Sequence, residues 1–175
     1  KPDDILLISL LGTFYGLNET YDQAIFFQKI AIEKAPFEPA FYKNLSETFK
    51  KVDKIRDALS FLYFAKILSF NDQSIDYEIA KLNTDLNNYL AADLIYTKLM
   101  REKNINKEIM YSYCSNLIKL NKFIESNFDM YEDKDNGAEN VKKTSSVKII
   151  YYKKMKDILH TIIQTCRQVA NEQFG

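Results

Sequence analysis

The chain of 175 residues contains only four glycines and three prolines. These two residue types form many of the turns in proteins built from short strands, so their scarcity disfavours an all-β fold and favours an all-α one. Apolar runs are also short: Ile5–Ile8 and Ala58–Ala65, the latter interrupted by Ser60, are far below the roughly 18–20 residues needed to cross a bilayer. We therefore expect helices that pack in water and no transmembrane segment.

Residues that commonly carry chemistry are scarce as well. The two cysteines, Cys114 and Cys166, show no metal-ligand spacing, and the single histidine, His160, has no second histidine one helical turn away. None of the glycines belongs to a phosphate-binding glycine pattern. No nucleophile with a base and no opposed pair of carboxylates is recognisable. We therefore expect a non-enzymatic protein without a cofactor or a metal site.

An excess of charge of one sign is missing too, because 24 lysines and arginines balance 24 acidic residues. Nucleic acid is therefore not an expected partner. The local exception is a run without an intervening acid, made of Lys142, Lys143, Lys148, Lys153, Lys154 and Lys156. We interpret this run as a solvated helix face beside a polar loop, and contact with an anionic membrane is the alternative.

What the chain does contain is a repeat of 34 residues. Aligned with itself at this shift, it has a Gly, Ala, Ser or Cys throughout two columns: Gly12, Ser46, Ala80 and Cys114, then Ala24, Ala58, Ala92 and Ser126. These four types make up only 27 of the 175 residues, so the composition alone does not explain the match. A small side chain at a fixed place in each unit lets two helices approach closely, which predicts a helical hairpin per unit.

The pattern resembles the tetratricopeptide repeat, whose period is also 34. The matching residues of the first two units are Ile8, Leu11, Gly12, Tyr15, Ala24, Gln28 and Pro36, then Tyr42, Leu45, Ser46, Phe49, Ala58, Leu62 and Phe70. The third unit keeps Ile79, Ala80, Ala92 and Tyr96, and the fourth keeps Met110, Tyr113, Cys114, Leu117, Ser126 and Met130. The resemblance covers about residues 5–132 and implies an all-α, right-handed superhelical solenoid of antiparallel helix pairs.

Turn and capping residues between the apolar segments define the expected helices. These helices are 4–17 with 21–34, 39–50 with 54–69, 73–86 with 89–102, and 107–120 with 122–132. Short connections make the helices of each pair antiparallel. Residues 1–132 are therefore expected to form four hairpins.

The last part of the chain departs from the repeat. Residues 133–146 have no apolar periodicity and are expected to form a flexible loop, whereas apolar residues return at helical spacing over 147–175 and predict one long C-terminal helix. The end of a solenoid exposes an apolar face, so we expect this helix to cap the last hairpin. The alternative is that it projects and serves self-association or partner binding.

In tetratricopeptide proteins the first helix of each pair lines a concave groove, and the resemblance implies the same here. The candidate partner-binding residues are Lys43, Glu47, Lys50, Tyr77, Lys81, Tyr111, Ser115 and Lys119. The tyrosines would offer rigid contact area, and lysines would pair with acidic groups. One subclass grips a C-terminal carboxylate of chaperones with lysines and asparagines. Only Asn44 matches that pattern in one register and only Lys43 in the other, which disfavours such a clamp.

The sequence therefore predicts a protein–protein interaction scaffold or adaptor that binds a peptide or helix of another protein. Two alternatives stay open: an assembly subunit that forms homo-oligomers through its terminal helix and the open end of the stack, and a secretion or assembly chaperone. No signal peptide is recognisable, so a soluble cytoplasmic domain is the default expectation. Because the chain starts at Lys1 without Met, we expect a fragment of a longer protein.

Overall fold

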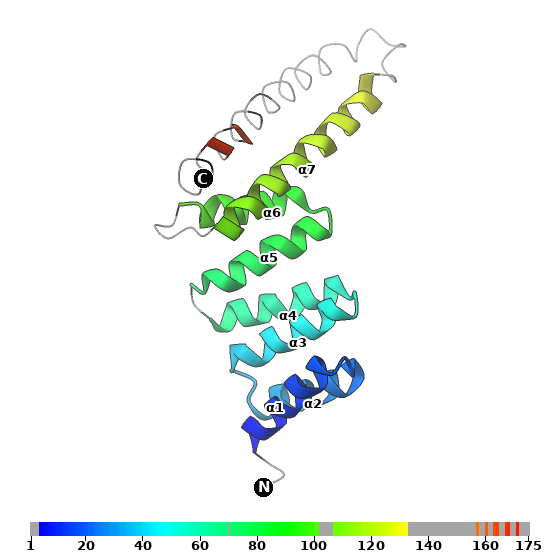
Figure 1. Cartoon of the computed structure of the whole chain (residues 1–175), viewed down its shortest axis with the longest axis vertical. Coiled ribbons are helices and arrows are strands. Elements are labelled where there is room, and N and C mark those ends of the chain that lie inside the picture. The colour runs from blue at the N-terminus through cyan, green and yellow to red at the C-terminus, as the bar shows by residue number, and fades with distance from the viewer. Residues whose placement is uncertain are drawn as a thin grey trace. The chain divides into compact units, whose positions relative to one another are not determined.

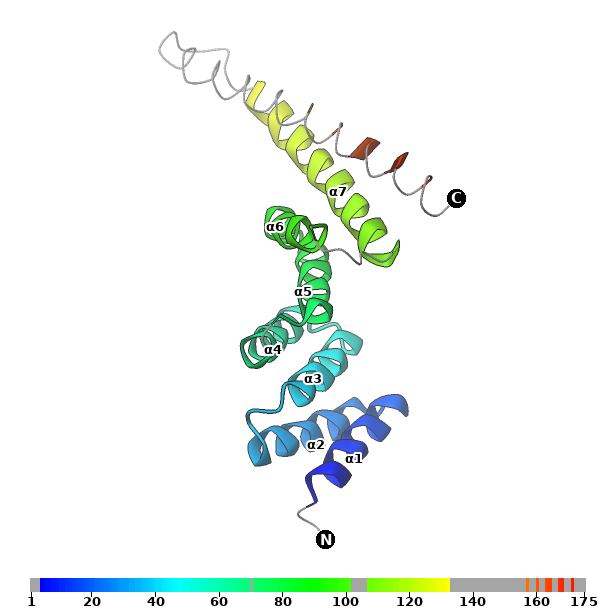
Figure 2. The same ribbon diagram turned by 90° about the vertical axis from the view of Figure 1, so that its left-hand side faces the viewer.

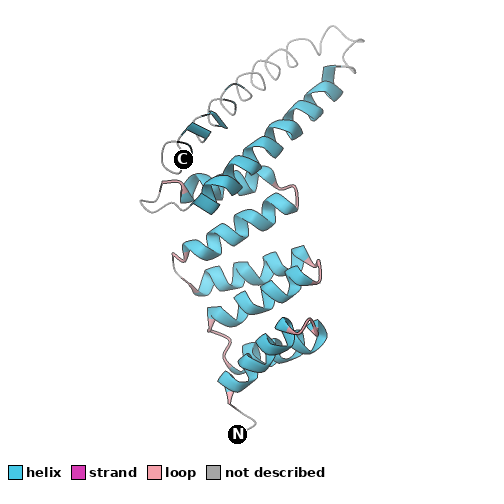
Figure 3. Cartoon of the chain, viewed as in Figure 1, coloured by secondary structure: helices cyan, strands magenta, loops and turns pink. Residues whose placement is uncertain are grey.

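The computed structural model describes residues 4–69, 71–101 and 107–132, together with positions 157, 160, 163, 164, 167, 168 and 171. Within these residues the chain forms α-helices and turns and contains no strand (Figure 1, Figure 3). The helices are α1 (Ile5–Leu17), α2 (Tyr21–Lys34), α3 (Pro39–Lys51), α4 (Ile55–Leu68), α5 (Gln73–Asp85), α6 (Tyr89–Leu99) and α7 (Lys107–Glu132). The all-α prediction is confirmed, and the first six helices match their expected bounds to within three residues.

The chain divides into two compact units, Lys1–Asn88 and Tyr89–Gly175. In the first unit, α1 pairs with α2 and α3 pairs with α4, and the second helix of each pair also packs against the next first helix, α3 or α5 (Figure 2). The first helices α1 and α3 touch each other as well. This is the arrangement of stacked helical hairpins that the repeat predicts.

Helix starts in the first unit follow from capping side chains. The carboxylate of Asp4 accepts a hydrogen bond from the backbone amide of Leu6 at 3.0 Å, and that of Asp72 accepts one from Ser74 at 2.9 Å. At the start of α3, Pro39 occupies the first helical position after Glu38. Each of these residues either satisfies or removes a backbone donor that a helix start leaves without a partner.

The same turn ends α1, α3 and α5. Glu19, Asp53 and Asn87 have positive φ values of 59°, 58° and 61°, at intervals of one repeat. In each case the next amide donates to a carbonyl five residues back, from Thr20 to Tyr15, from Lys54 to Phe49 and from Asn88 to Asn83. This is the Schellman arrangement, which uses a left-handed residue to satisfy the last carbonyls of a helix.

The two columns of small residues meet where the helices of a pair cross. In the second pair, the hydroxyl of Ser46 donates to the carbonyl of Ala58 at 2.8 Å, and both residues are fully buried. In the first pair, a Cβ added to Gly12 would lie 2.8 Å from Cγ of Gln28 and 3.3 Å from its backbone nitrogen. The first helix therefore needs a small residue at this position, as the sequence pattern indicates.

In the second unit, α6 packs against α7. The rings of Tyr96 and Tyr113 lie 5.5 Å apart, and the buried side chain of Asn116 donates to the carbonyl of Tyr89 at 3.1 Å. The hydroxyls of Thr97 and Tyr113 are 3.1 Å apart. These contacts join the two helices through both apolar and polar groups.

The expected turn near residue 121 is absent. Instead of two helices at 107–120 and 122–132, the chain forms the single 26-residue helix α7, so this part of the prediction is wrong. The side-chain amide of Asn121 donates to a carboxylate oxygen of Glu125, one turn later in the same helix, at 3.2 Å. Ser126, the last member of the second small-residue column, is exposed. No glycine or proline interrupts α7, so nothing local prevents the helix from continuing.

The predicted loop at 133–146 and the lysine run at 142–156 lie outside the described residues. Of the predicted terminal helix, the described positions from Asp157 to Asn171 are helical, and Ile163 is buried. The other positions of this helix, and its proposed capping role, stay predictions.

Candidate functional site

Three candidate residues, Lys43, Glu47 and Lys50, lie on α3 at intervals of four and three residues. This spacing places them on one side of the helix. Two more, Tyr77 and Lys81, lie on α5 at an interval of four. Both helices belong to the first unit, so five of the eight candidates come from two first helices of successive pairs.

Lys50 joins these two helices. Its ammonium lies 2.8 Å from a carboxylate oxygen of Glu47 and 2.7 Å from one of Glu78 on α5. Burial alone would lower the pKa of Lys50. The hydrogen bonds to both glutamates and their negative charges outweigh burial, so the pKa lies above that of an ordinary lysine. Lys50 is therefore a cation held by two internal partners.

Lys43 makes a second link between α3 and the start of α5. Its ammonium donates to the hydroxyl of Ser74 at 3.1 Å and lies 3.5 Å from a carboxylate oxygen of Asp72. Hydrogen bonds from Ser74 favour the ionised form of Asp72, with Lys43 adding to the effect, and they lower the pKa of this carboxyl despite partial burial. About two fifths of the Lys43 side chain stays exposed, so it can still contact a partner.

Tyr77 is only 7% exposed, so it offers a partner much less ring surface than its candidate role assumed. The ammonium of Lys81 lies 5.7 Å from the centre of this ring, within cation–π range. Behind this face, Lys66 of α4 pairs with the buried carboxylate of Asp76. The buried charge of Asp76 is therefore neutralised from α4, and the Lys81 ammonium lies over a ring of its own helix.

The remaining candidates, Tyr111, Ser115 and Lys119, lie in the second unit on α7. They are four residues apart, all are exposed, and Tyr111 keeps 59% of its surface accessible. They therefore form one row along the helix. All three residues of this row belong to the second unit.

Sequence reasoning missed the residues that hold the lysines in place: Asp72, Ser74 and Glu78. The signal is hydrogen-bonding complementarity at separations of 31 and 28 residues, between Lys43 and Ser74 and between Lys50 and Glu78. These separations fall short of the repeat length by three and six residues. Such pairs become recognisable only when it is known how far the first helix of one pair is shifted along its axis relative to the first helix of the next pair. The repeat period alone does not give this shift.

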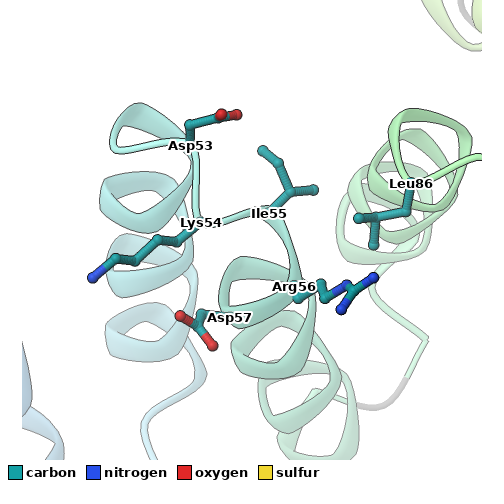
Figure 4. A pocket seen from close by; sticks show the side chains of 6 residues that line it. All are labelled: Asp53, Lys54, Ile55, Arg56, Asp57 and Leu86. Atoms are coloured by element: carbon teal, nitrogen blue, oxygen red, sulfur yellow. The ribbon is translucent and has the colours of Figure 1, made fainter.

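Sequence reasoning also missed an open cavity of about 490 Å³ in the first unit. It lies between the start of α4 and the end of α5, and it is lined by Asp53, Lys54, Ile55, Arg56, Asp57 and Leu86 (Figure 4). Arg56 extends from α4 towards the end of α5 that carries Leu86 (Figure 4). Two acidic and two basic side chains line the cavity, so it favours no ligand of one charge sign.

Within the described residues, no group of three or more His, Cys, Asp or Glu side chains is arranged to hold a metal ion. Nor does this part of the chain contain a helix long and apolar enough to cross a membrane. His160 is exposed, and its Nε2 lies 3.5 Å from the side-chain amide of Gln164. Cys114, in the small-residue column, is half-buried.

Comparison with known proteins gives a fold and no close relative. No family model matches the chain, and no curated protein matches its sequence. Among solved structures, the first TPR of Spaghetti (RPAP3), bound to the HSP90 peptide SRMEEVD, superposes with a TM-score of 0.62 at 18% identity. That match covers 69% of this chain and 95% of the other.

Two further structures agree. Yeast Tom70 has a TM-score of 0.62 at 24% identity over 70% of this chain, and the match covers only 26% of the Tom70 chain. YrrB, a TPR protein with an unusual peptide-binding site, has a TM-score of 0.61 at 12% identity, with 95% of this chain and 86% of YrrB covered. The chain therefore has the tetratricopeptide-repeat fold, an all-α repeat of paired helices.

Proposed function

We propose that this chain is a non-enzymatic adaptor that holds a segment of another protein against the first helices of its first unit. One observation carries the proposal. Lys50 bridges Glu47 on its own helix and Glu78 on α5, so the polar face of these helices is already ordered without a ligand. A surface ordered in advance loses little conformational entropy when a partner binds.

The comparisons support a peptide-binding role by analogy. Two proteins of the same fold have peptide-binding sites: Spaghetti binds an HSP90 peptide, and YrrB has an unusual peptide-binding site. In stacked hairpins the first helices supply a continuous surface for such a segment. The analogy concerns the place of binding, since low sequence identity does not transfer a specific ligand.

The charges of the site indicate the chemistry of the partner. Three lysines (Lys43, Lys50 and Lys81) stand beside three acidic groups (Glu47, Asp72 and Glu78), so the surface is balanced. A strongly acidic peptide would have to displace Glu47 and Glu78 from Lys50 and would also face their repulsion. The site therefore suits a segment with both donors and acceptors better than an acidic tail.

The row Tyr111, Ser115 and Lys119 is proposed as a second contact strip, on α7. It combines an exposed tyrosine ring, a residue type that is enriched at protein interfaces, with a hydroxyl and a cation that can form hydrogen bonds. Its contribution is separable from that of the first unit, because the two sets of residues lie in different units.

Selection from a displayed library of random peptides tests the proposal. We expect peptides selected on the wild-type chain to carry both charge signs and to lose about tenfold or more in affinity for the variant Lys43→Glu with Lys81→Glu. The matched control is Lys29→Glu with Lys54→Glu, which reverses two exposed lysines outside the helices α3 and α5 and should leave affinity unchanged.

Three results would contradict the proposal. The selected peptides could bind the Lys43 and Lys81 variant as well as the wild type. They could lose affinity equally for the control variant. The acidic peptide SRMEEVD could bind more tightly than any mixed-charge peptide, which would contradict the inferred partner chemistry.

A further inference from the structure

The open cavity of the first unit lies at a repeat position where this part of the chain differs from its neighbours. The second helices of successive pairs begin with Tyr21 in α2, Ile55 in α4 and Tyr89 in α6. Ile55 lines the cavity of about 490 Å³. Isoleucine is smaller than tyrosine and has no ring, so it fills less of the space beside the helix start. The cavity therefore adjoins the one of these three positions that lacks an aromatic ring.

Two aliphatic side chains lie on the two sides of the cavity. Ile55 stands at the start of α4 and Leu86 at the end of α5, and both are partly exposed (Figure 4). Because α4 packs against α5, both walls belong to one unit. A flat apolar group between them would remove apolar surface of the ligand and of both walls from water. The volume also lies within the range of roughly 300–1,000 Å³ that is usual for small-ligand sites.

Arg56 supplies a cation at this gap. Its side chain extends from α4 towards Leu86 (Figure 4). Among the described residues, its guanidinium forms no ion pair. The residues at the same repeat position are Asp22 in α2 and Leu90 in α6, so the fold itself does not need a cation here. The guanidinium is therefore available to an anionic group of a ligand that occupies the cavity.

The other charged groups of the cavity limit which anion fits. Lys54 and Asp57 extend to the side of α4 that faces away from α5, whereas Asp53 and Arg56 lie on opposite sides of Ile55 (Figure 4). The apolar gap thus has a cation on one side and a carboxylate on the other. A dianion such as phosphate would be attracted by Arg56 and repelled by Asp53. A ligand that carries one carboxylate and also an N–H donor would match both groups.

A ring, a carboxylate and an adjoining N–H donor together describe an aromatic amino acid. We propose that the cavity binds an aromatic amino acid, with its ring between Ile55 and Leu86 and its α-carboxylate on Arg56. The planar guanidinium can pair with both oxygens of such a carboxylate. A free amino acid and the C-terminal aromatic residue of a protein both present this chemistry. The site uses none of the candidate residues on α3, α5 and α7, so it does not depend on the proposed function, and either can fail without the other.

Amide NMR spectra of the intact chain, titrated with three probes, test the proposal. The probes are phenylalanine, a short peptide that ends in phenylalanine, and the same peptide with an amidated C-terminus. We expect the two probes with a free carboxylate to shift the amide signals of Ile55, Arg56 and Leu86. Amidation should weaken binding of the peptide about tenfold or more, because it removes the group that pairs with Arg56. A peptide that binds more tightly than phenylalanine identifies a protein C-terminus as the source of the ligand, and the reverse identifies the free amino acid.

Two variants test the two parts of the site separately. Arg56→Leu introduces the residue type that α6 has at the same repeat position, and it should weaken binding about tenfold or more. Ile55→Tyr introduces the ring with which α2 and α6 begin, and it should weaken binding to a similar degree by filling the cavity. Circular dichroism checks that both variants are folded. The matched control, Arg101→Leu, removes an exposed arginine of the second unit and should leave the affinity unchanged.

Four results would overturn the proposal. None of the probes could shift the amide signals at millimolar concentration. The peptide and its amide could bind equally well. Arg56→Leu, or a folded Ile55→Tyr chain, could bind as tightly as the wild type. The shifted signals could lie around Lys43 and Lys81 instead of at the cavity, which would place the ligand on the first helices.

Discussion

The end of α1, α3 and α5 differs from the middle of α7, although the sequence places them at equivalent positions. Glu19, Asp53 and Asn87 adopt left-handed backbone conformations, each one repeat apart. The next member of the series, Asn121, is helical. Asparagine tolerates the left-handed region better than glutamate does. The residue type therefore predicts the opposite of what is observed at Glu19 and Asn121.

The difference teaches that helix crossing, more than turn chemistry, decides whether a hairpin forms. In the first unit, the small residues of the two columns meet, as Ser46 and Ala58 do through a 2.8 Å hydrogen bond. In the second unit, Ser126 is exposed on α7, and its hydroxyl donates to Phe123 within the same helix. Among the described residues no second helix buries Ser126, and a continuous helix satisfies more backbone groups than a turn with a left-handed residue does.

The largest expected effect comes from filling the crossing. Ala58→Leu should destabilise the chain by roughly 1–3 kcal/mol, because Ala58 is fully buried against α3. Ser126→Leu changes the same column in the second unit and should alter stability by less than about 0.5 kcal/mol, because Ser126 is exposed. Urea denaturation measures both. Equal losses for the two variants would contradict the difference between the units.

Glycine at the turn positions should change the free energy of unfolding by a smaller amount, and differently at Asn121 in α7 and at Asn87 after α5. Asn121→Gly should cost about 1 kcal/mol, because it puts glycine inside a helix. Asn87→Gly should be neutral or slightly stabilising, because glycine adopts a φ of 61° without strain. Thermal unfolding of the two variants checks this. A stabilising Asn121→Gly would mean that α7 has a turn there after all.

The smallest effect concerns how one carboxyl in each unit makes the free energy of unfolding depend on pH, and the sign of this dependence differs between the two units. On α6, burial raises the pKa of Asp93, and a hydrogen bond from Tyr113 offsets only part of this. Folded protein then binds this proton more tightly than unfolded protein, so the free energy of unfolding falls as pH rises from about 3.9 through the folded-state pKa. Asp93→Asn should be up to about 1 kcal/mol more stable than the wild type at neutral pH, with no gain in acid.

Asp72 in the first unit is the matched control for this prediction. Its pKa is lowered, so its contribution to stability is present above about 3.9 and is lost as pH falls through the folded-state value. Asp72→Asn should therefore be less stable than the wild type at neutral pH, and the difference should disappear in acid. Denaturation midpoints measured across the acid range test both variants. Parallel pH profiles for the two would contradict the assignment.

The candidate site shows how far periodicity alone reaches. It placed Lys43, Glu47 and Lys50 on one side of α3, because helical spacing is a local property of the sequence. It did not predict the ion pair between Lys50 and Glu78, or that Tyr77 would be only 7% exposed. Both depend on how closely neighbouring helices lie and at what offset, which single-helix spacing does not contain.

The sequence by itself determined the helices, their bounds in the first six cases and the small residues at the crossings, because caps, apolar spacing and side-chain volume act over a few residues. Only the tertiary structure decided that α7 continues as one helix through Asn121, and that Lys43 and Lys50 of α3 pair with side chains at the start of α5 and on it. Each of these depends on whether another helix lies within reach. That is a property of packing between elements, and no local pattern encodes it.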